Sequence, residues 1–166
     1  MSSECLSNGM IEITGLCDTE TIDLQDGDSW TQISVPVVLI IPDVKPDIEQ
    51  VNSINISTKI IRKRVIETPA GTNEEGKILT GKKLIVEGLL CQTLSYTADV
   101  PEQSIHSVQL SVPFSAFIVV PADTNLDDNF EINACIEDVF IENICKRQVF
   151  ENVTLLLEAV KVDKDC

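Results

Sequence analysis

Cysteine and histidine are the residues of this chain with the most obvious chemistry, and their spacing restricts what that chemistry is. Six cysteines occur in 166 residues without a CxxC motif or a Cys/His cluster, so neither a zinc site nor a thioredoxin-like site is expected. The single histidine, His106, lies in the alternating stretch SIHSVQL, with no nucleophile or carboxylate arranged around it in sequence. We interpret His106 as a strand residue, and we predict no catalytic residue, no metal ligand, no cofactor and no enzymatic activity.

The cysteines differ in their sequence surroundings. Cys91 and Cys135 lie within strand-like runs, so they are expected to be buried or structural. Cys5 and Cys166 lie close to polar chain ends, where segments are usually exposed. This position favours disulfides between subunits over disulfides within one subunit. The candidates for intersubunit disulfides are Cys5, Cys17, Cys145 and Cys166. On one uninterrupted strand, Cys135 and Cys145 would lie roughly 33 Å apart, so these two are not expected to bond to each other.

The elements that must position these residues are predicted to be strands almost throughout. Apolar residues alternate, or form short β-branched runs bounded by Pro, Gly, Asp and Asn. Residues 84–96 and 108–118 each place apolar side chains on one face and polar ones on the other, which predicts a long hairpin. A second pair of long strands is expected over residues 130–145 and 147–162. We therefore predict an all-β fold: an antiparallel β-sandwich, or two stacked sheets built from long hairpins.

The N-terminal half follows the same pattern less regularly. Strands are expected over residues 30–41 and 51–67. Pro46, with acidic residues after it, predicts one short helical turn near residues 46–51.

The chain is expected to divide into an N-terminal arm, residues 1–25, and a β domain, residues 26–166, with a short C-terminal tail that ends in a cysteine. The arm contains an alternating segment that could add as a strand to the open sheet edge of a neighbouring subunit. Its candidate strand-donating residues are Met10, Ile11, Ile13 and Leu16. The alternative is that residues up to about Leu24 form the first strand of the same domain.

Charge excludes several classes of partner. With 12 Lys+Arg against 27 Asp+Glu, the chain carries a formal net charge of −15, which disfavours nucleic acid and anionic membrane surfaces. No basic residue precedes Lys45, and positive charge is concentrated in residues 59–64 and 77–83. This pattern indicates either a solvated surface that keeps the protein soluble, or attraction between the basic middle and the acidic arm of successive subunits.

The sequence contains one incomplete calcium-loop motif and no targeting or membrane-spanning segment. Residues 123–129 begin like a calcium loop, but Asp128 and Ala134 stand where an EF-hand needs Gly and Glu, so at most an irregular cation site is expected. The N-terminus has no basic start and no apolar run of signal-peptide length, and the longest apolar run, residues 37–41, is too short to cross a bilayer. We therefore expect synthesis in the cytoplasm and no membrane insertion.

Several motifs, in their order along the chain, resemble the SPOCS domain of clostridial spore morphogenesis and spore-coat proteins. The resemblance covers about residues 30–162. Its features are Lys45-Pro46-Asp47, Thr80-Gly81-Lys82-Lys83-Leu84 with Gly88 in the same strand, Tyr96, Ser104-Ile105-His106-Ser107 and Pro113-Phe114-Ser115. It implies a non-enzymatic β-rich module that acts through protein–protein contacts in the outer layers of the spore.

Taken with this resemblance, the cysteines and the arm predict a self-assembling spore-surface protein made in the mother-cell cytoplasm. It would be a subunit of a coat, an exosporium or a surface fibre, and it would polymerise by strand addition and intersubunit disulfides. Its partners would be copies of itself, with other spore-coat proteins as further candidates. The alternative is an adaptor that does not polymerise and recruits another spore-coat morphogenetic protein.

Overall fold

The computed structural model describes residues 11–72, 74–76 and 78–163. Strands dominate the described chain, and its only helical element is one short 3₁₀ helix. The elements are β1 (Glu12–Thr14), η1 (Thr19–Thr21), β2 (Ser29–Ile40), β3 (Ile48–Thr72), β4 (Ile78–Ala98), β5 (Ile105–Val119), β6 (Asn129–Cys145) and β7 (Gln148–Val162).

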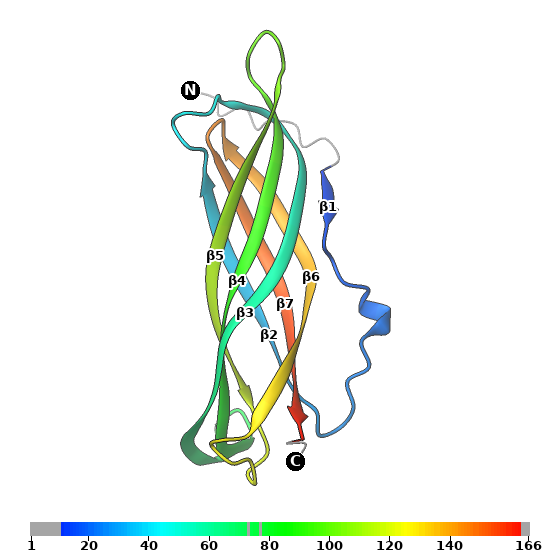
Figure 1. Cartoon of the computed structure of the whole chain (residues 1–166), viewed down its shortest axis with the longest axis vertical. Helices are drawn as coiled ribbons and strands as arrows, with labels where there is room; N and C mark the ends of the chain where they lie inside the picture. Colours follow the sequence, from blue (N-terminus) through cyan, green and yellow to red (C-terminus); the bar gives the residue numbers. More distant parts are fainter. Residues whose placement is uncertain (1–10, 73, 77, 164–166) are drawn as a thin grey trace.

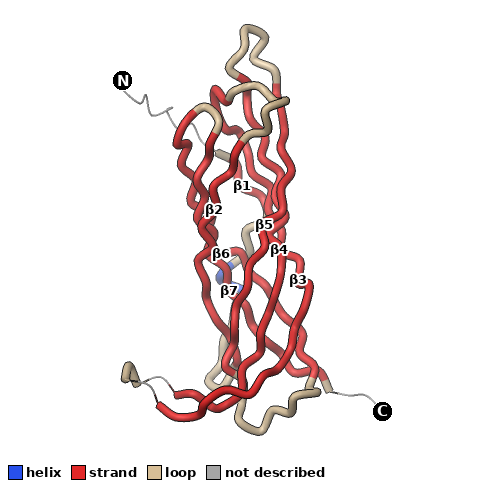
Figure 2. Tube along the Cα trace, turned by 90° about the vertical axis from the view of Figure 1, so that its left-hand side faces the viewer, coloured by secondary structure: helices blue, strands red, loops and turns tan. Residues whose placement is uncertain are grey.

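These strands form two sheets that face each other along an elongated molecule (Figures 1 and 2). Sheet A has the order β1-β3-β4-β5, and sheet B has the order β2-β7-β6. All pairs are antiparallel except β1 with β3, which run parallel. At the edges, β2 lies beside β5 and β3 lies beside β6, so the two sheets meet along two seams. The predicted all-β architecture of two stacked sheets is confirmed.

Alternation of apolar and polar residues determines which face of each strand is buried between the sheets. Along β4, the side chains of Leu84, Val86, Leu90, Leu94 and Tyr96 are buried between the sheets, whereas the intervening residues lie on the wetter outer face. Successive side chains of a strand point to opposite faces, so this period of two fixes the register of the whole sheet. No helix of the described chain is long and apolar enough to cross a membrane.

The helical turn predicted near residues 46–51 is wrong. β3 already begins at Ile48, whose backbone N–H donates to the carbonyl oxygen of Lys146, and the carbonyl of Asp47 accepts from Asp99. The backbone groups that a helical turn would use are therefore taken by neighbouring elements. The chain turns earlier instead, where the N–H of Lys45 donates to the carbonyl of Pro42.

Candidate assembly surfaces

The N-terminal arm closes the seam between β3 and β6. β1 pairs with β3 so that Ile13 lies opposite Ile54, and the side chains of Ile11 and Ile13 pack against the core. Gly15 follows at φ +111°, and a Cβ atom there would overlap the carbonyl oxygen of Ile56. The absence of a side chain at this point lets the arm lie close against β3 (Figure 1).

This position of the arm matches the alternative interpretation, in which the N-terminal residues form the first strand of the same β domain. Of the predicted strand-donating residues, Ile11 and Ile13 are partly buried within the same chain, and Leu16 is exposed. Met10 lies outside the described residues. Donation of this strand to a neighbouring subunit stays a prediction.

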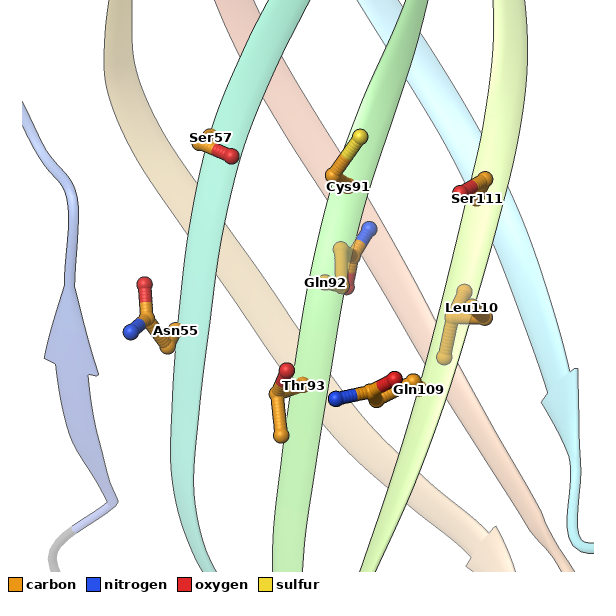
Figure 3. Close-up of a pocket in the computed structure, with 8 residues that line it drawn as sticks. All are labelled: Asn55, Ser57, Cys91, Gln92, Thr93, Gln109, Leu110 and Ser111. Atoms are coloured by element: carbon orange, nitrogen blue, oxygen red, sulfur yellow. The ribbon is translucent and has the colours of Figure 1, made fainter.

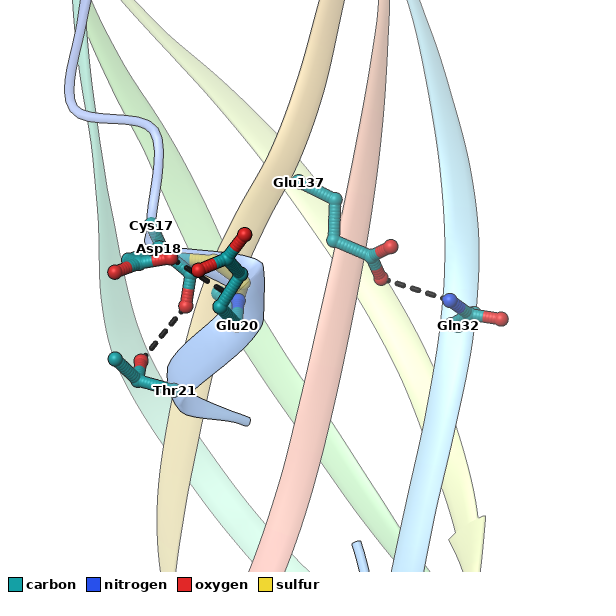
Figure 4. The surroundings of a disulfide bond; sticks show 7 residues. Cys17, Asp18, Glu20, Thr21, Gln32 and Glu137 are labelled. Carbon is teal, nitrogen blue, oxygen red and sulfur yellow. Dashed lines mark hydrogen bonds between the residues drawn. A yellow bond between two sulfur atoms is a disulfide. The ribbon is translucent and has the colours of Figure 1, made fainter. Parts of the chain in front are cut away.

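Cys17 anchors the end of the arm to sheet B (Figure 4). It forms a disulfide with Cys135 of β6, with the two Cα atoms 5.4 Å apart, and its backbone N–H donates to the carbonyl of Ile136. The structure thus pairs Cys17 within its own chain rather than leaving it free, and a bond from Cys17 to another subunit stays a prediction. Sequence periodicity could not reveal that partner across 118 residues. Cys135 is buried, as expected.

We expect Gly15→Ala to release the arm while the two-sheet body stays folded. The new methyl group would overlap the carbonyl of Ile56, and the backbone would also be held at a positive φ that costs an L-residue about 1–2 kcal/mol. Hydrogen exchange should show the amides of residues 12–14 losing at least about tenfold protection. Gly27→Ala is the matched control, since Gly27 also has a positive φ but nothing lies near its Cβ position. Unchanged protection in Gly15→Ala would contradict this role.

The other cysteines differ in accessibility. Cys145 is exposed and free at the end of β6, so its intersubunit role stays a prediction. Cys91 is also free, and it is half-buried on the outer face of sheet A rather than in the core, so the expectation that it is buried or structural stays a prediction. Cys5 and Cys166 lie outside the described residues.

Cys91 belongs to a shallow polar concavity of about 450 Å³ on sheet A (Figure 3). Cross-strand pairing aligns two rows of small, uncharged side chains over β3, β4 and β5. The rows are Ser57–Cys91–Ser111 and Asn55–Thr93–Gln109. Hydroxyl and amide groups of this kind offer hydrogen bonds to a partner without adding charge.

The seam between β2 and β5 carries a groove of about 490 Å³ with mainly apolar walls. Both strands are sheet edges, but each contributes a proline to the groove, Pro36 from β2 and Pro113 from β5. Proline lacks the backbone N–H that pairs with an added strand, so these edges are poorly suited to extend either sheet. Among the described elements, strand addition is seen only at β3.

Arg147 connects two loops at one end of the molecule. Its guanidinium donates to the carboxylate of Asp47 at 2.7 Å and to the carbonyl of Lys45 at 3.2 Å. The second nitrogen donates to the carbonyls of Ile41 and Pro42 at 3.1 and 2.9 Å. One planar cation therefore holds the β6–β7 turn to the β2–β3 connection.

The aromatic residues of the motif lie at the same end. The hydroxyl of Tyr96 donates to the carbonyl of Pro46 at 2.7 Å, and its ring stacks on that of His106 with centroids 5.8 Å apart. The hydroxyl of Ser104 shares a hydrogen bond of 3.0 Å with Nε2 of His106. His106 lies in β5, which confirms it as a strand residue. Burial raises the pKa of Tyr96, while the charge of Arg147 opposes that rise. The structure thus gives these motif residues contacts that hold the fold together.

Glu151 and Gln92 place two polar side chains in the core. Glu151 on β7 is fully buried, and Gln92 on β4 is 3% exposed. Within the described chain, the side-chain polar atoms of both residues lack a partner of hydrogen-bonding geometry. Burial raises the pKa of Glu151 to about 7, and the nearby amide of Gln92 partly opposes this rise. A carboxyl group buried in this way makes stability depend on pH near neutrality.

The acidic loop over residues 123–129 is fixed by contacts within the protein. The carboxylate of Asp128 accepts from the backbone N–H of Asn125 at 2.9 Å and pairs with Lys161 at 3.0 Å. In the described part of the chain, no group of three or more His, Cys, Asp or Glu side chains could hold a metal ion.

The sequence analysis did not identify Glu151 or Arg147 as important residues. For Glu151, the sequence does contain a signal. Residues 149, 151, 153, 155 and 157 alternate onto one face of a predicted strand, and Glu151 is the only acidic residue among them. That signal identifies a buried carboxyl. Nothing comparable identifies Arg147, because its acceptors are mostly backbone carbonyls about 100 residues away in sequence.

Comparison with known proteins adds one match. A family model described as "SipL, SPOCS domain" matches residues 47–144, which is more than half of the chain. The matched segment holds almost all of β3 to β6, whereas the arm, β2 and β7 lie outside it. No curated protein and no solved structure matches.

Proposed function

The chain belongs to the SPOCS-domain family of SipL, and from this premise we propose that it is a self-assembling structural protein of the spore surface. Family membership indicates a spore-associated, structural role. The proposal goes further, to a subunit of a coat, exosporium or surface fibre whose copies are joined by exchanged arms and disulfides. One observation carries it: the arm is a short element outside the family-matched segment, and it closes a seam of the fold.

The contacts of the arm are suited to exchange between copies. β1 contributes three residue pairs with β3, and the arm then reaches β6 through Cys17. Residues 15–28, which connect the arm to β2, contain only η1 and turns, and 14 extended residues would span roughly 45 Å. An arm that bound a neighbouring copy would contact the equivalent β3 edge and the equivalent Cys135 of that copy. Exchange of this kind creates subunit contacts from interactions that the fold already uses.

Disulfide formation would make such contacts permanent. Two thiols, Cys17 of one copy and Cys135 of the next, would lose two electrons and two protons to an oxidant such as dioxygen. The reducing mother-cell cytoplasm would keep the thiols free during assembly, and oxidising surroundings after release would close the bonds. Exposed Cys145 would be available for further links of the same chemistry.

The second candidate function is an adaptor that does not polymerise. It is favoured by the observation that the arm pairs within its own chain and that the β2–β5 groove is apolar and open. In this case the protein would stay a monomer or small oligomer and would recruit another coat protein through an exposed face.

Negative-stain electron microscopy should separate the two functions. Reduced protein is concentrated and then oxidised slowly, beside a variant chain that begins at Asp26 and so lacks the arm. We expect filaments or lattices from the full chain and only small particles from the variant. After oxidation, the assemblies should survive boiling in detergent until a reductant is added.

Small particles of uniform size from the full chain in every condition would contradict self-assembly and favour the adaptor. Assemblies that form equally well without the arm would contradict arm exchange alone. Circular dichroism of the truncated chain would show whether its sheets persist.

A further inference from the structure

Positive charge gathers on one outer face of the sandwich. The basic face consists of Lys59, Arg62, Arg64 and Lys83, with the exposed apolar side chains of Ile61 and Phe117. These residues lie on the outer side of sheet A, toward the β3–β4 hairpin, and Nζ of Lys83 stands 4.2 Å from the Phe117 ring centroid. In the described chain, the three cations on β3 form no ion pair with a carboxylate. Glu87, half-buried opposite Arg62, is the acidic residue within this face.

The opposite outer face has the complementary character. The acidic face consists of Asp138 and Glu142 of β6, with the exposed apolar side chains of Val38, Ile40 and Phe140. It lies on the outer side of sheet B, toward the β6–β7 turn. The two cations of the β6–β7 turn, Lys146 and Arg147, are paired with Asp99 and Asp47. The carboxylates of the acidic face therefore have no cation partner within the described chain.

Both faces have the composition of a protein–protein contact. Each combines large exposed apolar side chains, which soluble monomers rarely gather in one place, with charges of a single predominant sign. The two signs are opposite, so each face is complementary to the other and repels a second copy of itself.

The positions of the faces determine what such a contact would build. They lie on opposite sheets, and they also lie toward opposite ends of the long axis, as the strand directions in Figure 1 show. We propose that the basic face of one copy stacks on the acidic face of the next, with the copies staggered along their length. Because the contact is heterologous, it leaves one free face at each end and propagates into an open filament. This inference rests on the proposed self-assembly, but it uses no residue of the arm.

Charge reversal tests the stack directly. One variant carries Arg62→Glu and Arg64→Glu, so that both of its faces are acidic; the other carries Asp138→Lys and Glu142→Lys, so that both are basic. All proteins are first oxidised as monomers, which locks the arm through Cys17–Cys135 and excludes arm exchange. Sedimentation velocity is then measured for wild type, for each variant and for their equimolar mixture.

We expect wild type to assemble, each variant alone to need at least about tenfold higher concentration, and the mixture to assemble as an alternating polymer. The control is Val44→Glu, Lys45→Glu and Leu126→Glu, which changes the net charge by the same −4 as the first variant but lies outside both faces. This control should assemble like wild type.

Three results would overturn the stack: a wild-type protein that stays monomeric, variants that assemble like wild type, or a mixture that fails while wild type assembles. None of these depends on the arm, so failure of the stack leaves arm exchange to be judged by its own experiment. If the stack forms but arms do not exchange, the proposed disulfide mechanism fails and the filament contact stands.

Discussion

Glu151→Gln should stabilise the protein above neutral pH by about 3 kcal/mol and leave its stability unchanged in acid. Burial raises the pKa of Glu151 from an ordinary 4.5 to about 7, so the folded state holds its proton more tightly than the unfolded state does. Each unit of pKa difference corresponds to about 1.4 kcal/mol. The neutral amide of glutamine never has to ionise.

The sign of the pH effect follows from the proton count. Below about pH 4.5 the carboxyl is protonated in both states, and the stability associated with its proton is fully present. Between about pH 4.5 and 7 the folded state binds more protons, so the wild-type free energy of unfolding falls as pH rises. Above pH 7 the ionised carboxylate stays buried, and the difference from the variant is largest.

Urea unfolding of wild type and Glu151→Gln from pH 4 to pH 8 measures this difference. The matched control is Glu158→Gln, on the same strand but on the outer face of sheet B, which should run parallel to wild type. A stability difference between Glu151→Gln and wild type that does not change with pH would contradict the assigned burial.

The second large effect is expected at Arg147. Arg147→Met should lower the free energy of unfolding by about 3 kcal/mol, because it removes a charge-assisted pair with Asp47 and the guanidinium donors to the carbonyls of Ile41, Pro42 and Lys45, of which Pro42 keeps the N–H of Lys45. Thermal and urea unfolding measure the loss. Arg147→Lys keeps the charge but not the planar set of donors, so it should recover only part of it.

Lys146→Met is the neighbouring control. The ion pair of Lys146 with Asp99 is more than one third exposed on both sides, and such pairs contribute about 1 kcal/mol or less. Equal losses for Arg147→Met and Lys146→Met would show that the guanidinium does not organise this end of the molecule.

The strands and their buried faces were predictable because apolar and polar residues alternate along the sequence with a period of two. Leu84, Val86, Leu90, Leu94 and Tyr96 were assigned to the core from alternation alone, and all five are buried. The hairpin from β4 to β5 followed from two such runs on either side of a short polar turn. The local pattern was sufficient to assign the faces because each strand has one buried face and one solvent-exposed face.

Features that depend on distant partners were not predictable. The helical turn expected after Pro46 does not form, because the backbone groups of Ile48 and Asp47 make hydrogen bonds with Lys146 and Asp99, which are distant in sequence. The Cys17–Cys135 bond was missed for the same reason, since no local rule selects one partner among six cysteines. The charged faces were visible only as runs in sequence, and register was needed to place them on opposite sheets.

Isotope mixing tests the central claim, arm exchange between copies, most directly. Equal amounts of reduced ¹⁴N and ¹⁵N wild-type protein are mixed at high concentration, oxidised and digested, and the Cys17–Cys135 peptide pairs are identified by mass spectrometry. Exchanged arms predict that about half of the Cys17–Cys135 pairs join a light to a heavy peptide, because partners are drawn at random from the two pools. Pairs that are all light or all heavy would show that every arm stays on its own chain and would contradict the account.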